Sequence, residues 1–129
     1  MHEDIFTLFA EGTLADGDQR LDLASLPWQA HPQFAGVFLK NLVTLAQTGG
    51  RFSCHLVRIE PNHAIGWHSH PASIELHEVM RGEGICRTEQ GDIRYVPGAM
   101  GIMAANSFHE VAAGGQGLFF FAKFVTEAA

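Results

Sequence analysis

Residues 67–79 read WHSHPASIELHEV, a run that holds three histidines and two glutamates. Successive side chains of an extended chain point to opposite faces, so residues two apart share a face. His68 and His70 therefore project the same way, and so do Glu75 and His77. This alternation predicts β-strands that carry several potential metal ligands.

Pro71 interrupts this run. Proline cannot donate to a strand ladder, which predicts two strands joined by a bend at 71–73. Two imidazoles from one strand and a carboxylate from the next can converge on one cation. The same residue types also suit a solvated polar face, so a metal site requires a further ligand elsewhere in the chain.

The spacing in this region resembles the first motif of the cupins, which is a glycine, five residues, H-x-H, three or four residues, E, six residues and G. His68, His70, Glu75 and Gly82 occupy the corresponding positions, and Asn62 stands where the motif opens with glycine. Asparagine is enriched among non-glycine residues at positive φ, so the turn is expected to survive this replacement.

The second cupin motif is a glycine, five residues, P-x-G, two residues, H, three residues and N. A register that starts at Gly91 puts Ile102 at the histidine position and fails. A register that starts at Gly98 places Asn106 at the second glycine and His109 at the histidine. His109 is therefore the expected fourth ligand.

This resemblance covers roughly residues 50–126 and implies an all-β fold, the double-stranded β-helix or jelly-roll (cupin) barrel. It implies that one divalent transition-metal ion is bound by three histidines and one glutamate, namely His68, His70, Glu75 and His109. Such a nitrogen-rich set with one oxygen suits iron or manganese, which are favoured here, and also nickel, cobalt or zinc.

The order of elements supports an all-β fold without the resemblance. Strands are expected at 21–23, 37–45, 51–60, 65–70, 74–81, 84–89, 91–96, 100–103, 107–112 and 118–125, with turns at the glycines between them. We expect an N-terminal arm over 1–35, which makes packing or dimer contacts, and a barrel domain over 36–129.

Two of these expected segments need another surface to pack against. Ile5, Leu8 and Phe9 have helical spacing over too few turns to be stable alone, so this helix must dock on something. The last strand, 118–125, is apolar on both faces, which predicts either a homodimer interface or cover by another segment.

Composition limits the possible partners. The chain has 129 residues and a net charge of −6, which fits one domain and argues against nucleic acid or an anionic membrane as a partner. Cys54 and Cys86 are expected to be buried thiols in a reducing compartment. No signal peptide or long apolar run is seen, so we expect a cytoplasmic protein.

His77 is the additional residue of most interest. It shares the face of Glu75, where it can act as a catalytic acid or base, or instead orient Glu75; both roles remain open. The remaining histidines are interpreted as surface or hydrogen-bonded core residues: His2, His31, His55 and His63. Packing roles are expected for Tyr95, Cys86, Met80, Met100 and Met103, and outward-facing positions for Glu78 and Glu110.

The functional prediction is an enzyme that acts on a small-molecule substrate, chelating and partly apolar, at the metal. Cupins with such ligands suggest dioxygenase-like chemistry, or metal-assisted lyase or isomerase chemistry. The alternative is a non-enzymatic module that binds or senses a metal or small ligand, because cupins host many activities as well as none.

Overall fold

The computed structural model describes residues 4–127. Its elements, in chain order, are α1 (Ile5–Ala10), β1 (Thr13–Asp16), β2 (Gln19–Asp22), the 3₁₀ turn η1 (Leu23–Ser25), β3 (Gln29–Ala30), β4 (Val37–Val43), the 3₁₀ turn η2 (Leu45–Thr48), β5 (Phe52–Ile59), β6 (Ala64–His68), β7 (Ser73–Thr88), β8 (Gly91–Tyr95), β9 (Met100–Met103) and β10 (His109–Thr126). The predicted all-β fold is confirmed.

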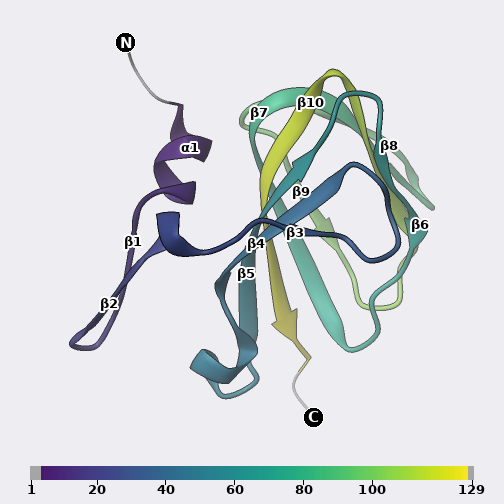
Figure 1. Cartoon of the computed structure of the whole chain (residues 1–129). Coiled ribbons are helices and arrows are strands. Elements are labelled where there is room, and N and C mark those ends of the chain that lie inside the picture. The colour runs from purple at the N-terminus through teal and green to yellow at the C-terminus, as the bar shows by residue number, and fades with distance from the viewer. Residues whose placement is uncertain (1–3, 128–129) are drawn as a thin grey trace.

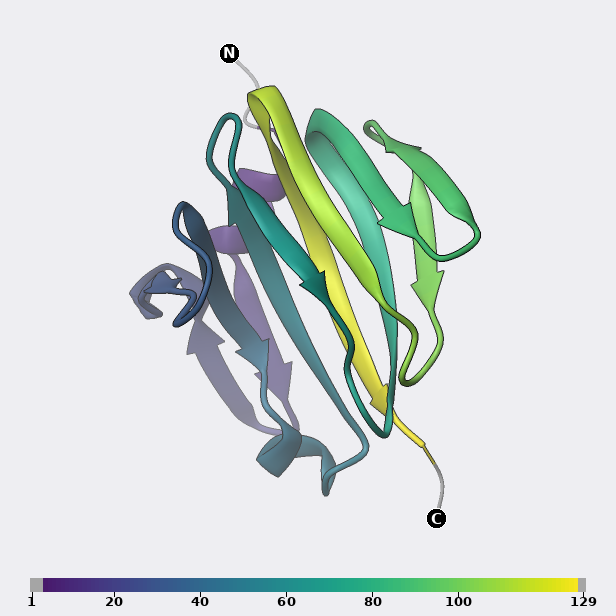
Figure 2. The same ribbon diagram turned by 90° about the vertical axis from the view of Figure 1, so that its right-hand side faces the viewer.

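Two long strands, β7 and β10, build the barrel (Figure 1). The second half of β10 pairs with β5 and with the first half of β7, which pairs in turn with β9. The first half of β10 pairs with β6 and with the second half of β7, which pairs with β8. Both strands arch over one end of the molecule, as Figure 2 shows for β10, and so they belong to both walls of the barrel.

The prediction that separated 74–81 from 84–89, and 107–112 from 118–125, was wrong. Each pair is one strand with a register shift rather than two strands with a turn. Gly82 makes the bend possible, because its φ is +85° and a Cβ there would lie 2.0 Å from the carbonyl oxygen of Gly117. The glycines thus mark a place where two backbones approach closely, not a chain reversal.

The N-terminal helix packs on the barrel through a different face from the one expected. Phe6 and Ala10 are buried, whereas Ile5, Leu8 and Phe9 are each more than 40% exposed. Phe6 lies edge-on to Phe119 of β10, with ring centroids 5.1 Å apart. At Phe119 and Phe121, the outer apolar side of the last strand is therefore covered by another segment of the same chain, one of the two alternatives its sequence allowed, whereas Val125 is 49% exposed.

The apolar core has two parts. One lies inside the barrel and includes Cys86, Tyr95 and Met103; the other lies between the barrel and the arm and includes Cys54. Both cysteines are buried free thiols, as predicted. Met100 is 59% exposed, so its predicted core position was wrong. Within residues 4–127, no helix is long and apolar enough to span a membrane.

Candidate metal centre

The four residues that the cupin resemblance selected lie together in the structure. His68 ends β6, His70 lies in the following loop, Glu75 belongs to β7 and His109 begins β10. One ligand atom from each lies within 4.8 Å of the others. Antiparallel pairing brings the distant segments together, since His109 is the register partner of His68 across β6 and β10.

Two turns hold these ligands in place. Asn62 and Asn106, which replace glycines of the motifs, have φ values of 61° and 65°. The expectation that asparagine preserves the first turn is confirmed, and the same holds for the second. The backbone N–H of Asn106 donates to the carbonyl oxygen of His70 at 2.9 Å, which ties the loop before His109 to the loop that carries His70.

The protonation of His68 is set by its neighbour. Its Nδ1 lies 2.6 Å from the carbonyl oxygen of Gly66, which can only accept, so Nδ1 carries a proton. Burial lowers the pKa of His68, which favours the neutral ring. The lone pair of Nε2 then points toward His70, whose Nε2 is 3.1 Å away. A cation placed between the Nε2 atoms of His68 and His70 would bind this lone pair.

Glu75 is the buried anion of the group, with 5% exposure. Its Oε1 lies 3.0 Å from His109 Nε2 and 3.6 Å from His70 Nε2. Burial alone would raise the pKa of Glu75, but close contacts with His109 and His77 outweigh burial and hold that pKa well below its ordinary value. The carboxylate is therefore ionised and offsets one unit of a cation's charge.

Several buried polar atoms at this point make no well-oriented hydrogen bond within residues 4–127, although two of them, Glu75 Oε1 and His109 Nε2, lie only 3.0 Å apart. They are Glu75 Oε1 and both ring nitrogens of His109. A divalent cation would take up Glu75 Oε1 and one nitrogen of His109 at once, leaving the other nitrogen protonated. The donor set and its unpaired atoms fit a metal ion.

His77 lies behind Glu75, on the same face, as the alternation predicted. Its Nε2 is 2.8 Å from Glu75 Oε2 and its Nδ1 is 2.8 Å from the hydroxyl of Tyr95. Because an ionised carboxylate only accepts, Nε2 donates to Glu75, and in the neutral ring Nδ1 then accepts from the hydroxyl of Tyr95. Tyr95 is fully buried, and a Cβ at Gly101 would lie 2.2 Å from its hydroxyl oxygen.

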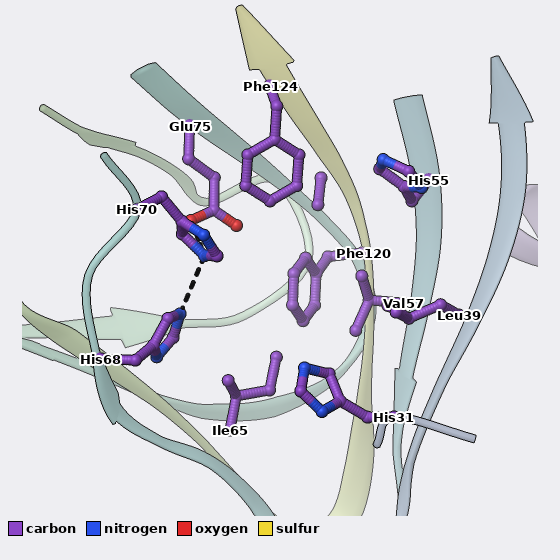
Figure 3. Close-up of a pocket in the computed structure, with 11 residues that line it drawn as sticks. His31, Leu39, His55, Val57, Ile65, His68, His70, Glu75, Phe120 and Phe124 are labelled. Carbon is purple, nitrogen blue, oxygen red and sulfur yellow. Dashed lines mark hydrogen bonds and ion pairs between the residues drawn. The ribbon is translucent and has the colours of Figure 1, made fainter. Parts of the chain in front are cut away.

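A cavity of about 150 Å³ is lined by three of the four candidate ligands, His68, His70 and Glu75 (Figure 3). Its lining residues are His31, Leu39, His55, Val57, Ile65, His68, His70, Glu75, Phe120, Ala122 and Phe124. His77, Tyr95 and Cys86 are not among them, which agrees with the packing roles expected of the last two.

Two of the lining residues are histidines that were not predicted to face the site. His31 and His55, interpreted as ordinary surface or core histidines, both face the cavity. His31 reaches the cavity from the segment before β4, and His55 reaches it from β5. Both lie outside the two motifs, so no motif spacing pointed to them. His63 is exposed, as expected, and His2 lies outside the described residues.

The outward-facing glutamates behave as predicted, but they are paired. Glu78 lies 2.6 Å from Lys123, and Glu110 lies 2.7 Å from Arg87. Neither contributes to the ligand group.

No protein-family model and no curated protein sequence matches the chain. Solved structures do match it. A predicted oxalate decarboxylase from Thermotoga maritima has 16% identity and a TM-score of 0.74, over 81% of this chain and 96% of that chain. The polyketide cyclase RemF from Streptomyces resistomycificus has 18% identity and a TM-score of 0.71, over 84% and 80%.

A third match, the cupin domain of Cnp3 from Schizosaccharomyces pombe, has 10% identity and a TM-score of 0.70, over 84% of this chain and 77% of that one. At such identities the likeness concerns the fold. The chain has the cupin fold, and the proteins that share this fold include enzymes of different kinds.

Proposed function

We propose that this cupin-fold protein is a metal-dependent enzyme, in which His68, His70, Glu75 and His109 bind one divalent transition-metal ion beside a small chelating substrate. The observation that supports the proposal most is the convergence of four ligand atoms within 4.8 Å, with the carboxylate of Glu75 and the ring of His109 both buried. Three neutral imidazoles and one carboxylate favour iron or manganese in this setting, with nickel, cobalt and zinc as alternatives.

Each residue has a defined part in holding the ion. Gly66 fixes the ring of His68 with Nε2 free. Glu75 Oε1 faces the histidines, while its Oε2 is retained by His77. We therefore favour the orienting role for His77 over direct acid or base catalysis, because both of its nitrogens are engaged and its ring does not line the cavity.

The cavity suits a small molecule. Its 150 Å³ is about five times the volume that one water molecule takes in the liquid, and it lies below the roughly 300 Å³ of the smallest drug-sized pockets. Most of its lining is apolar, and its polar atoms are concentrated in the histidines and Glu75. A compact substrate with a chelating end and an apolar body fits these walls.

When bound, such an ion acts as a Lewis acid toward an oxygen substituent of the substrate, or supplies redox chemistry toward dioxygen. The substrate's apolar part would lie against Phe120, Ile65 and Val57. We propose dioxygenase-like cleavage first, and metal-assisted lyase or isomerase chemistry second.

Metal titration tests the binding step. The wild-type protein should bind one equivalent of at least one of Fe(II), Mn(II), Co(II), Ni(II) and Zn(II). Glu75→Gln keeps the shape of the side chain but removes its charge, and should weaken binding at least tenfold. Glu78→Gln, on the outer face of the same strand, is the matched control and should bind as wild type does. Failure of the wild-type protein to bind any of these ions would refute the metal centre.

Oxygen uptake tests the reaction. Iron-loaded and metal-free protein should be compared with small catechols, thiols and 2-oxo acids, with product analysis for oxygen-independent turnover. Uptake only by the loaded protein supports a dioxygenase, and turnover without uptake supports a lyase or isomerase. Metal binding without turnover of any candidate would favour the sensing module instead.

A further inference from the structure

His31 is a polar group in the cavity that does not belong to the four ligands. It lies at the start of the loop between β3 and β4, and its Nδ1 accepts from the backbone N–H groups of Gln33 at 3.1 Å and Phe34 at 3.4 Å. A backbone N–H can only donate, so Nδ1 holds the lone pair, and the neutral ring carries its proton on Nε2. Figure 3 shows the ring of His31 turned toward the cavity, with Ile65 and Phe120 as neighbours.

The loop that carries His31 is seated on the strand that carries His68. The ring centroid of Phe34 lies 6.0 Å from that of His68 and 4.9 Å from that of His31. A Cβ at Gly66 would lie 3.0 Å from Phe34, so the absence of a side chain at Gly66 leaves room for this ring. The position of His31 relative to the proposed metal centre is thus fixed by packing.

The other histidine outside the ligand group differs from His31. His55 has both ring nitrogens engaged, Nδ1 with Asn41 Oδ1 at 2.7 Å and Nε2 with Ser53 Oγ at 2.9 Å. His31 has its Nε2–H without a protein acceptor among the described contacts. It is therefore the member of this pair that can donate to a molecule in the cavity.

We infer that His31 is a specificity-determining residue, whose Nε2–H donates to a neutral oxygen at the far end of the substrate while the near end chelates the metal. This inference rests on the proposed function. Glu75 offsets one charge of a divalent ion, which leaves a site suited to a monoanionic head. No lysine or arginine within residues 4–127 lines the cavity, so a second carboxylate at the far end would lack a counter-charge among them.

The chemical class is therefore a small 2-oxo acid, or a similar monoanionic chelator, with an apolar body and a distal carbonyl or hydroxyl. The apolar body matches the aliphatic and aromatic walls, which are Leu39, Val57, Ile65, Phe120, Ala122 and Phe124. The distal acceptor matches the donor of His31.

Two substitutions separate the donor of His31 from its role in the loop. His31→Asn places an amide oxygen near the position of Nδ1, which preserves acceptance from the Gln33 N–H but removes the far donor. His31→Gln places an amide N–H near the position of Nε2 and loses the Nδ1 acceptor. His63→Gln, at an exposed histidine, is the matched control.

Calorimetry with Co(II)-loaded protein provides the readout. The probes are 2-oxo acids of five, six and seven carbons, each with and without a second carbonyl toward the far end. In wild type and His63→Gln, at least one dicarbonyl acid should bind about three- to tenfold more tightly than its monocarbonyl partner, the gain expected of one hydrogen bond. His31→Asn should abolish this gain, and His31→Gln should retain part of it.

The outcomes are distinguishable. If Co(II) or the monocarbonyl acids do not bind wild type, both the proposed function and this inference fail. If they bind, but the dicarbonyl acids show no gain, or His31→Asn keeps the gain, this inference alone fails. Equal loss in both His31 variants would show that the residue only holds the loop, which also overturns the inference.

Discussion

A buried hydroxyl determines how Glu75 is held. Tyr95 donates to His77, and His77 donates to Glu75 Oε2, so that Oε1 is left to face the histidines. Burial raises the pKa of Tyr95, which keeps the phenol protonated as a donor. The hydroxyl fits only because Gly101, opposite His77 in the β7–β9 pairing, has no side chain.

This arrangement predicts an energetic coupling between Tyr95 and Gly101. Gly101→Ala should destabilise the wild-type protein by about 1–3 kcal/mol, because the new methyl would overlap the Tyr95 hydroxyl. In a Tyr95→Phe background, the nearest remaining atoms are more than 3 Å away, so the same change should cost little. Urea unfolding of the two single variants and the double variant measures the coupling. Strictly additive costs would contradict it.

At the scale of elements, the N-terminal arm is joined to the barrel by a buried lysine. Lys40 of β4 is 3% exposed and donates to the carbonyl oxygens of Ala10 at 2.7 Å and Leu23 at 2.8 Å. Ala10 is the last residue of α1 and Leu23 is the first residue of η1. One ammonium group therefore holds two turns of the arm. The side chain also lies over the ring of Trp28.

Lys40→Met should therefore loosen the arm. The substitution preserves apolar contact but leaves two carbonyls without their donor, which should lower the free energy of unfolding by at least about 2 kcal/mol. Hydrogen exchange should accelerate over α1, β1 and β2 before the barrel is affected. Lys123→Met, which removes a partly exposed ion pair with Glu78, should cost no more than about 1 kcal/mol. Equal effects of the two changes would contradict the role of Lys40.

Elements differ in how far the sequence predicts them. The ligand group and its turns were predictable, because metal ligands and positive-φ positions impose fixed spacings, as Asn62 shows. The continuity of β7 and β10 was not, because a glycine that allows a bend has the same sequence signal as one that allows a turn. The burial of Lys40 and the orientation of His31 toward the cavity were not predictable either. Both depend on contacts between segments that are distant in the sequence, and a local sequence pattern carries no information about such contacts.

At the scale of the whole molecule, an apolar area remains on the outer face of the barrel. It is formed by Ile74, Met100, Ile102 and Val125, which are 41%, 59%, 72% and 49% exposed. Strand pairing places them on adjoining strands, since Ile74 pairs with Val125 and Leu76 with Ile102. A two-fold dimer uses the same area on both copies, so we expect a homodimer through this face.

Ile102→Glu tests the dimer. A carboxylate at the most exposed of these positions would have to be desolvated in a dimer interface, so the variant should sediment as a monomer when wild type sediments as a dimer. Ile85→Glu, on the other half of β7, is the control and should leave the dimer intact. A monomeric wild-type protein, or a dimer unaffected by Ile102→Glu, would refute the expected interface.

Four partly buried histidines also set how the whole molecule responds to pH. Burial lowers the pKa of His31, His55, His68 and His70 from the ordinary value of 6.5. The unfolded chain therefore takes up protons first as the pH falls, and the folded state loses stability below about pH 6.5. Glu75 affects stability over a lower pH range. Because its pKa in the folded protein is lowered, it stabilises the fold at and above pH 4.5, its ordinary pKa, and this stabilisation is lost only at lower pH.

Metal-free protein should consequently have its urea midpoint fall steadily between pH 7 and pH 5. Replacing two of the four histidines, in a His68→Gln and His70→Gln double variant, should flatten this slope, because glutamine takes up no proton in either state. His63→Gln should leave the slope as it is in wild type, since that side chain is exposed. A midpoint that stays level or rises toward pH 5, or a slope unchanged in the double variant, would show that these partly buried imidazoles do not control the acid stability of the barrel.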